Sequence, residues 1–284
     1  MRTAAAPDPH HRYLIGGELA VNRIGYGTMQ LTGPGHWGDP ADIGNAVHVL
    51  RRAVALGINH LDTADAYGPH VAEHLIHKAL HPYPTDLVIA TKGGMTRQGP
   101  NLWTPLGRPE YLRQCVEMSL RRLRLDCIDL YYLHRVDPAV PLEDQLGALD
   151  DLRREGKIRH LGLSKVTVEQ IEAARASTPI AAVQNKFNQR EAGREVLDYC
   201  TTAQIAFVPY APLAAGALVA GRDAIDTAAA ATGSLRWLLA QSPAVLPIPG
   251  TASLIHLTQN SAASQAQHSC EATSAEPSAD RAGQ

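Results

Sequence analysis

The sequence predicts an α/β fold, a (β/α)₈ TIM barrel with an N-terminal β-hairpin at its bottom. Short apolar runs of strand length alternate with segments of helical periodicity along most of the 284 residues. Polar residues also stand at the ends of three successive strand-like runs, where such a barrel builds its active site. An open, doubly wound sheet is the alternative, but no Gly-x-Gly-x-x-Gly motif follows any of these runs.

The predicted elements follow one another regularly after a hairpin formed by residues 13–15 and 19–21 around Gly16-Gly17. The eight barrel strands are expected at 24–27, 58–61, 87–91, 128–133, 158–163, 180–184, 205–210 and 245–248. Helices are expected at 41–56, 71–80, 109–124, 141–155, 167–176, 195–203 and 224–241. Residues 1–11 are expected to form an extension and 12–260 the barrel, whereas 261–284, nearly free of large apolar residues, form a disordered tail.

Composition and charge narrow the class of protein. With 26 basic and 28 acidic residues the net charge is −2, which indicates no nucleic-acid or membrane-surface partner. No apolar run approaches the ~20 residues of a membrane span, and residues 1–11 lack the apolar core of a secretory signal. The four cysteines show neither a Cys-x-x-Cys nor a zinc-binding spacing. We therefore expect a soluble, cytoplasmic, single-domain protein. A small-molecule partner and a monomeric state are expected as well.

Four polar residues stand at the ends of three successive predicted strands. Asp62 ends one strand and Tyr67 lies five residues further on, while Lys92 and His134 end the next two. A free tyrosine has a pKa near ~10, and a lysine ammonium beside it would favour the phenolate, with an aspartate holding that lysine charged. His134 could donate a ring N–H to a carbonyl oxygen. Each residue alone could be a structural ion pair or a buried histidine, but together they predict acid–base chemistry on a carbonyl group.

These residues, with the string DTADAYG at 62–68, resemble the catalytic tetrad of the aldo-keto reductases. The resemblance runs from about Ile24 to Asn260 and is nearest to the bacterial pyridoxal-reductase-like branch. It is carried by GYGTMQLTGPGHWG (25–38), DTADAYGPH (62–70), ALHPYPTDLVIATKGG (79–94) and IPGTASLIHLTQN (248–260). The resemblance implies an NADPH-dependent reductase that transfers a hydride to a small aldehyde or ketone. Pyridoxal is a candidate substrate, and NADH is a possible second cofactor.

The resemblance also implies where cofactor and substrate bind. Ser164 and Gln184 match the positions that hold the nicotinamide carboxamide, and Lys165 stands where relatives usually carry Asn. Tyr210 matches the aromatic residue that stacks on the nicotinamide, and the loop after it resembles the one over the pyrophosphate. The implied cofactor residues are Gly27, Thr28, Ser164, Gln184, Tyr210, Pro212, Leu213, Gly216, Gly250, Thr251, Ser253, His256, Gln259 and Asn260, and the implied substrate residues are Met29, Trp37 and Trp103.

Residues 249–260 resemble the family's site for the adenosine 2′-phosphate, at a helix N-terminus where backbone N–H groups favour an anion. Relatives often carry a basic residue at position 252 and a glutamate at 259, where this sequence has Ala252 and Gln259. His256 and Asn260 fit the pattern. We therefore expect NADPH to be preferred over NADH by a moderate margin.

Three other functions can be weighed on the same residues. A non-catalytic cofactor-binding barrel that acts as a redox-sensing partner subunit remains the alternative, because positions 252 and 259 depart from the family. A barrel isomerase or lyase for a phosphorylated sugar is disfavoured by the order Asp–Tyr–Lys–His. Metal binding by the four histidines between 70 and 81 is not expected, since one helix supplies poor tetrahedral geometry.

Overall fold

Seven parallel strands form the wall of the protein. The computed structural model describes residues 12–191, 193–213 and 224–263, and the account below concerns these residues. Hydrogen bonds order the strands β11-β10-β9-β8-β5-β4-β3, so neighbours in the sheet are also successive wall strands along the chain. The strands are β3 (Tyr26–Gly27), β4 (His60–Asp62), β5 (Val88–Gly93), β8 (Ile128–Leu133), β9 (Ile158–Ser164), β10 (Ile180–Gln184) and β11 (Ala206–Phe207).

The barrel closes through residues 244–248. Val245 forms a parallel bridge with Phe207 of β11, and the Leu246 N–H donates to the Phe207 carbonyl over 2.8 Å. On the other side, the Gly25 N–H donates to the Pro247 carbonyl over 2.9 Å. The predicted strand 245–248 thus takes the eighth place in the wall, but it is not a regular strand, because Pro247 has no N–H to donate.

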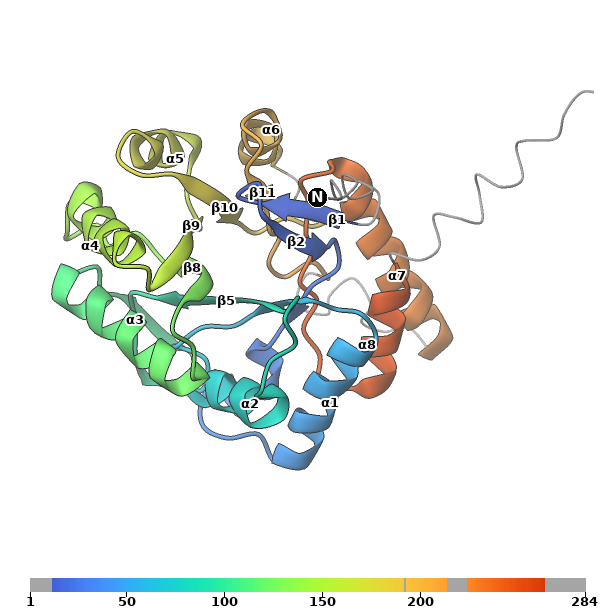
Figure 1. Cartoon of the computed structure of the whole chain (residues 1–284). Coiled ribbons are helices and arrows are strands. Elements are labelled where there is room, and N and C mark those ends of the chain that lie inside the picture. Colours follow the sequence, from blue (N-terminus) through green and yellow to red (C-terminus); the bar gives the residue numbers. More distant parts are fainter. Residues whose placement is uncertain (1–11, 192, 214–223, 264–284) are drawn as a thin grey trace, which may run out of the picture.

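Eight helices of the described chain surround this wall. Figure 1 shows α1 to α6 arranged outside the sheet, with α7 and α8 filling the ring between α6 and α1. Local signals set several boundaries: the Asp42 side chain caps α1, and Thr167 with Gln170 forms a capping box at α5. The helices are α1 (Ile43–Ala55), α2 (Val71–Leu80), α3 (Pro109–Leu123), α4 (Leu142–Arg154), α5 (Val168–Arg175), α6 (Glu195–Thr202), α7 (Ala224–Gln241) and α8 (Leu254–Ser261). The predicted α/β barrel is confirmed.

The N-terminal hairpin closes the bottom of the barrel. Strands β1 (Arg12–Ile15) and β2 (Leu19–Asn22) pair antiparallel and lie across the centre of the view in Figure 1. Ile15, Leu19 and Val21 are buried against the residues that fill the barrel interior. Those interior residues are Val88, Ala90, Leu130, Tyr132, Ala182, Ala206, Val208, Leu246 and Ile248.

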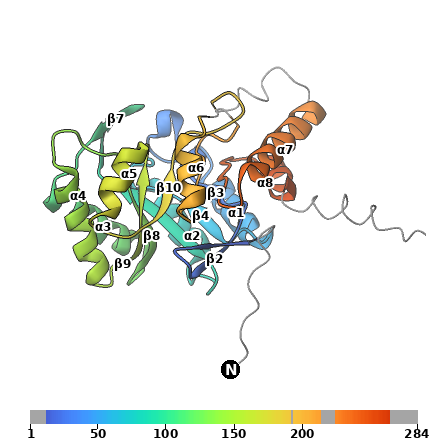
Figure 2. The ribbon, with the colours of Figure 1, turned by 90° about the horizontal axis from the view of Figure 1, so that it is seen from above.

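A second antiparallel hairpin, which the sequence did not predict, follows β5. It consists of β6 (Met95–Gly99) and β7 (Leu102–Pro105). Figure 2 shows β7 and the N-terminal hairpin at opposite ends of the molecule. Residues 95–105 fall in none of the predicted elements, and they form an ordered flap at the end of the strands where the polar residues gather.

The C-terminal boundary also differs from expectation. Helix α8 ends at Ser261, and Ala263 is buried in the core, so the packed chain extends slightly beyond residue 260. The rest of the expected tail, 264–284, and the whole extension 1–11 lie outside the described residues. In the described part, no helix is long and apolar enough to span a membrane.

Candidate active site

A cavity of about 1010 Å³ opens at the carboxyl ends of the strands. Asp62, Ser164 and Gln184 line it as the last residues of β4, β9 and β10. His134 follows β8 directly and lines it as well. Since parallel strands bring these ends to one rim, residues more than a hundred positions apart share one site.

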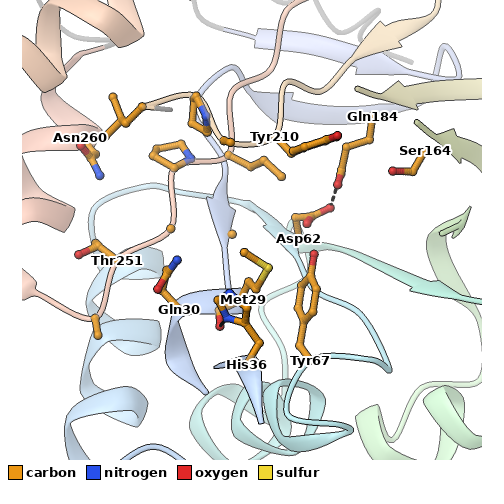
Figure 3. Close-up of a pocket in the computed structure, with 18 of the residues that line it drawn as sticks. Met29, Gln30, His36, Asp62, Tyr67, Ser164, Gln184, Tyr210, Thr251 and Asn260 are labelled. Carbon is orange, nitrogen blue, oxygen red and sulfur yellow. Dashed lines mark hydrogen bonds between the residues drawn. The ribbon is translucent and has the colours of Figure 1, made fainter. Parts of the chain in front are cut away.

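Lys92 is the centre of a buried polar cluster on the cavity wall. Its Nζ lies 2.5 Å from Asp62 Oδ1, 2.8 Å from the Thr63 carbonyl and 3.2 Å from the Tyr67 hydroxyl. The second Asp62 oxygen accepts from Gln184 Nε2 at 2.7 Å, the bond drawn in Figure 3. The Lys92 and Asp62 side chains are 0% and 2% exposed, so the ion pair is nearly free of solvent screening.

Burial sets the protonation of the tyrosine more strongly than its lysine neighbour does. Burial raises the pKa of Tyr67, and the Lys92 ammonium lowers it only in part. For Lys92 itself, burial lowers the pKa, but the charge of Asp62 and the contact with Tyr67 outweigh burial, and the pKa ends above its ordinary value. At neutral pH the cluster therefore holds a charged lysine beside a protonated phenol. Lys92 favours the phenolate as predicted, but it does not bring the pKa of Tyr67 below the value of a free tyrosine.

His134 supplies a neutral imidazole next to this phenol. Its ring centroid lies 6.0 Å from that of Tyr67, edge to face. Burial lowers the pKa of His134 well below its usual range, and the charge of Lys92 acts in the same direction. Its Nδ1 is buried and has no hydrogen-bond partner among the described residues. The ring can thus serve as a neutral N–H donor over the pH range in which most enzymes work.

The flap formed by β6 and β7 carries Trp103 over the site. The indole centroid lies 6.3 Å from Tyr67 and 6.2 Å from His134, both in edge contacts. The guanidinium of Arg97 stacks on the Trp103 ring, with Cζ 3.6 Å from the ring centroid. Arg97 is held by five backbone carbonyls, those of Gly35, His36, Ala66, Gly99 and Leu102.

The cavity extends from this cluster towards α8, as Figure 3 shows with Tyr67 and Gln184 at one end and Thr251 and Asn260 at the other. Tyr210 lines the middle of the cavity, and its N–H donates to the Asn185 carbonyl at 3.0 Å. The cavity is therefore elongated, with an aromatic wall between two polar ends.

Two glycines form a close backbone contact on the cavity wall. A Cβ on Gly250 would lie 2.6 Å from the Gly27 carbonyl oxygen, and one on Gly27 would lie 2.8 Å from the Ile248 carbonyl oxygen. Both glycines line the cavity. Because neither position admits a side chain, the backbone itself forms this part of the cavity, and a bound molecule can approach it closely.

The turn before α8 is held by side chains from the first elements of the chain. The Tyr26 hydroxyl donates to the Thr251 carbonyl at 2.6 Å, and Asn45 Nδ2 donates to the Ala252 carbonyl at 2.9 Å. Ser253 caps α8 by accepting from the His256 N–H. The helix N-terminus that the sequence predicted as a phosphate site is thus present and faces the cavity end lined by Thr251, His256, Gln259 and Asn260.

Most predicted site residues line this cavity, and a few do not. Thr28 is buried and donates to the Asp62 carbonyl, and Lys92 lies behind Tyr67. Trp37 lies outside the described lining, with Arg97 Cζ 5.7 Å from its ring centroid, because the turn at 33–38 bridges it to Gly68. Its assignment to the substrate stays a prediction. Ser253 caps α8 and is not on the lining, and Gly216 lies outside the described residues. The predicted residues on the lining are Asp62, Tyr67, His134, Gly27, Ser164, Gln184, Tyr210, Pro212, Leu213, Gly250, Thr251, His256, Gln259, Asn260, Met29 and Trp103.

Sequence reasoning missed several lining residues. Met95, Asn101 and Arg135 line the cavity although they lie in no motif, and His36 lines it although it was not named within the string at 25–38. Arg135 had the clearest signal, a basic residue directly after a polar strand end. In the described chain, no group of three or more His, Cys, Asp or Glu side chains is placed to hold a metal ion.

Fold and site together define an α/β barrel with a buried aspartate–lysine–tyrosine cluster and a neutral histidine at the strand ends. The model of the aldo/keto reductase family matches residues 23–230. The chain is 46% identical to an uncharacterised oxidoreductase of Schizosaccharomyces pombe over 90% of this chain and 85% of that one. It is 41% identical to pyridoxine 4-dehydrogenase of Escherichia coli, over 87% of this chain and 91% of that enzyme.

A solved structure supports the same assignment. The aldo-keto reductase of Klebsiella pneumoniae in complex with NADPH superposes with a TM-score of 0.76 at 28% identity, covering 93% of this chain and 92% of that one. The chain therefore belongs to the aldo/keto reductase family, as the resemblance predicted, and is an NAD(P)H-dependent oxidoreductase.

Proposed function

We propose that this protein reduces the carbonyl group of a small aldehyde or ketone with NADPH, and that pyridoxal is the first substrate to test. The observation that carries the proposal is the contact of Lys92 Nζ with both Asp62 and the Tyr67 hydroxyl, beside His134 on the cavity wall. An acid, its tuning cation and a neutral N–H donor are what carbonyl reduction requires of a protein.

Two relatives support the choice of cofactor and substrate. The related Klebsiella enzyme is in complex with NADPH, and the related Escherichia coli enzyme is a pyridoxine 4-dehydrogenase. Pyridoxal is the aldehyde that corresponds to pyridoxine, so its reduction is the reverse direction of that chemistry.

The residues of the elongated cavity fit a nicotinamide dinucleotide. Ser164 and Gln184 offer a hydroxyl and an amide at the catalytic end, and Tyr210 offers an aromatic face. The backbone approach at Gly27 and Gly250 leaves room for a close contact in the middle. Gln184 also donates to Asp62, so a carboxamide held by this side chain would be tied to the acid–base cluster. When bound, the cofactor supplies the hydride.

Within this arrangement the protein moves one proton. His134 donates its N–H to the carbonyl oxygen of the substrate and orients it. The raised pKa of Tyr67, caused by burial, keeps the phenol protonated at neutral pH, so it can donate its proton to that oxygen. Lys92 then stabilises the phenolate that remains, and Asp62 keeps Lys92 charged. Trp103 covers the two reacting side chains and excludes water from them.

A non-catalytic redox sensor is not favoured. Such a barrel would need only the cofactor end of the cavity, whereas this chain keeps the complete cluster of Asp62, Tyr67, Lys92 and His134. Burying a charged pair carries a desolvation cost, so its presence here favours a role in stability or in chemistry.

The test is NADPH oxidation with pyridoxal and with simple aldehydes, in the wild type and in Tyr67→Phe. We expect Tyr67→Phe to lower turnover by on the order of 10²–10⁴-fold with NADPH affinity nearly unchanged. Tyr83→Phe is the matched control, because that hydroxyl bonds the Leu123 carbonyl away from the cavity, and it should turn over like the wild type. Wild-type turnover in Tyr67→Phe would rule out this tyrosine as the proton donor.

A further inference from the structure

One cation on the cavity wall has no role in the reaction described above. Arg135 follows His134 directly at the end of β8 and lines the same cavity. Its Nη1 atom is buried and has no hydrogen-bond partner among the described residues. A buried donor of a charged group without a partner is costly, and an acceptor supplied by a ligand would remove that cost.

The carboxylates nearest along the fold do not supply this acceptor. Asp62 is the only carboxylate among the described lining residues, and its two oxygens accept from Lys92 and Gln184. Asp137 lies two residues after Arg135, but its two oxygens accept from backbone N–H groups of neighbouring loops. Among the described residues, Arg135 therefore faces the cavity without a carboxylate partner.

The other arginine near the site provides a contrast. Arg97 donates from all three guanidinium nitrogens to five backbone carbonyls and stacks on Trp103. Its hydrogen-bonding capacity is used to hold the flap. Of these two arginines, only Arg135 keeps a buried donor without a partner in the described chain.

Arg135 lies at the reacting end of the cavity. It directly follows His134 at the end of β8, and both residues line the cavity. Burial is the main influence on the pKa of Tyr67 and of His134, and the charge of Arg135 lowers both pKa values as well. The residues around Thr251 and Asn260, where the cofactor phosphate is expected, stand at the opposite end in Figure 3.

We propose that Arg135 binds an anionic group of the substrate, so that the preferred carbonyl compounds carry a carboxylate or a phosphate. The inference rests on the proposed function, whose carbonyl substrate it narrows to anionic compounds. A planar guanidinium matches both oxyanions through two parallel hydrogen bonds, and a substrate held in this way would have its carbonyl fixed beside Tyr67 and His134.

The experiment compares matched aldehydes that differ in charge. The carboxylate arm uses 4-carboxybenzaldehyde and its methyl ester, and the phosphate arm uses pyridoxal 5′-phosphate and pyridoxal. In at least one arm, the wild type should show a kcat/KM about 10–100-fold higher for the anion, the size expected of one charge-assisted hydrogen bond. Arg135→Gln should reduce this ratio to about 1, and Arg135→Lys should restore part of it, because a lysine keeps the charge but not the paired donors.

Arg108→Gln is the matched control, since it removes the same charge from a side chain that is 69% exposed, and it should leave the ratio unchanged. A wild-type ratio near 1 in both arms, or an equal ratio in Arg135→Gln, overturns the inference while the reductase activity stands. Weaker NADPH binding in Arg135→Gln with an unchanged ratio also overturns it and assigns Arg135 to the cofactor. If no aldehyde is turned over, benzoate binding is measured by calorimetry in the wild type and in Arg135→Gln. Binding that is lost in Arg135→Gln supports the anion site although the proposed function fails. Equal binding in both proteins overturns the anion site.

Discussion

The buried pair of Lys92 and Asp62 should behave as one energetic unit. Lys92→Met leaves the Asp62 carboxylate with only the Gln184 amide as a side-chain partner, and Asp62→Asn leaves the ammonium with the Thr63 carbonyl and the Tyr67 hydroxyl. Because the two side chains are 0% and 2% exposed, solvent cannot compensate for either loss. Removing one partner of such a pair costs about 3–5 kcal/mol of the free energy of unfolding.

The double variant Asp62→Asn with Lys92→Met should cost less than the two single changes together, because neither charge is then left unpaired. We expect a coupling energy of at least about 2 kcal/mol. Urea unfolding gives each free energy, with equal m-values as the condition for comparing midpoints. The surface pair of Lys157 and Glu117, 2.7 Å apart and 34% and 42% exposed, provides the control cycle, for which about 0–1 kcal/mol is expected. A coupling energy no larger than that of the surface pair would show that Lys92 and Asp62 do not act as one energetic unit.

Two further predictions concern residues outside this pair. Burial, with the neighbouring charge of Glu73, raises the pKa of Asp65 to about 7. Between about pH 4 and pH 7 the unfolded chain therefore loses a proton that the folded chain keeps, and the free energy of unfolding falls as pH rises. Relative to the wild type, Asp65→Asn should therefore gain about 2–4 kcal/mol of unfolding free energy across this window and no more above it; a difference that does not vary with pH would contradict the assignment. Ala252→Arg should raise the preference for NADPH over NADH about 10-fold, the worth of one charge-assisted hydrogen bond to the 2′-phosphate, as measured by titrating both cofactors. An unchanged ratio would place the phosphate elsewhere than residues 249–260.

The fold was predictable because local patterns and barrel geometry agree. Short, largely apolar runs such as 128–133 between amphipathic helices indicate buried strands, and parallel strands in a barrel end on the same rim. The placement of Asp62, Lys92 and His134 at the ends of adjacent strands follows from that rule. Their contact distances do not, but residue types at consecutive strand ends are sufficient to predict the cluster.

The flap over the site was not predictable from the sequence. Its strands contain Thr96, Arg97 and Gln98, so they lack the apolar alternation by which a strand is recognised. What orders the flap is Arg97, and its carbonyl partners in the turn at 35–36 and at Ala66 are 31 to 62 residues away in the chain. The raised pKa of Tyr67 was not predicted, for a related reason. The sequence shows that a lysine is near, but only the folded structure shows how completely the phenol is buried.

The cofactor end of the cavity depends on closure of the barrel. Gly27 belongs to the first wall strand and Gly250 follows the closing segment. They meet where the barrel closes, beside the hydrogen bond from the Gly25 N–H to the Pro247 carbonyl. Tyr26 adds a second tie by donating to the Thr251 carbonyl. A molecule held between these segments contacts both edges of the closure and has no such site in the unfolded chain. Its binding free energy therefore adds to the stability of the barrel where the wall has no regular strand.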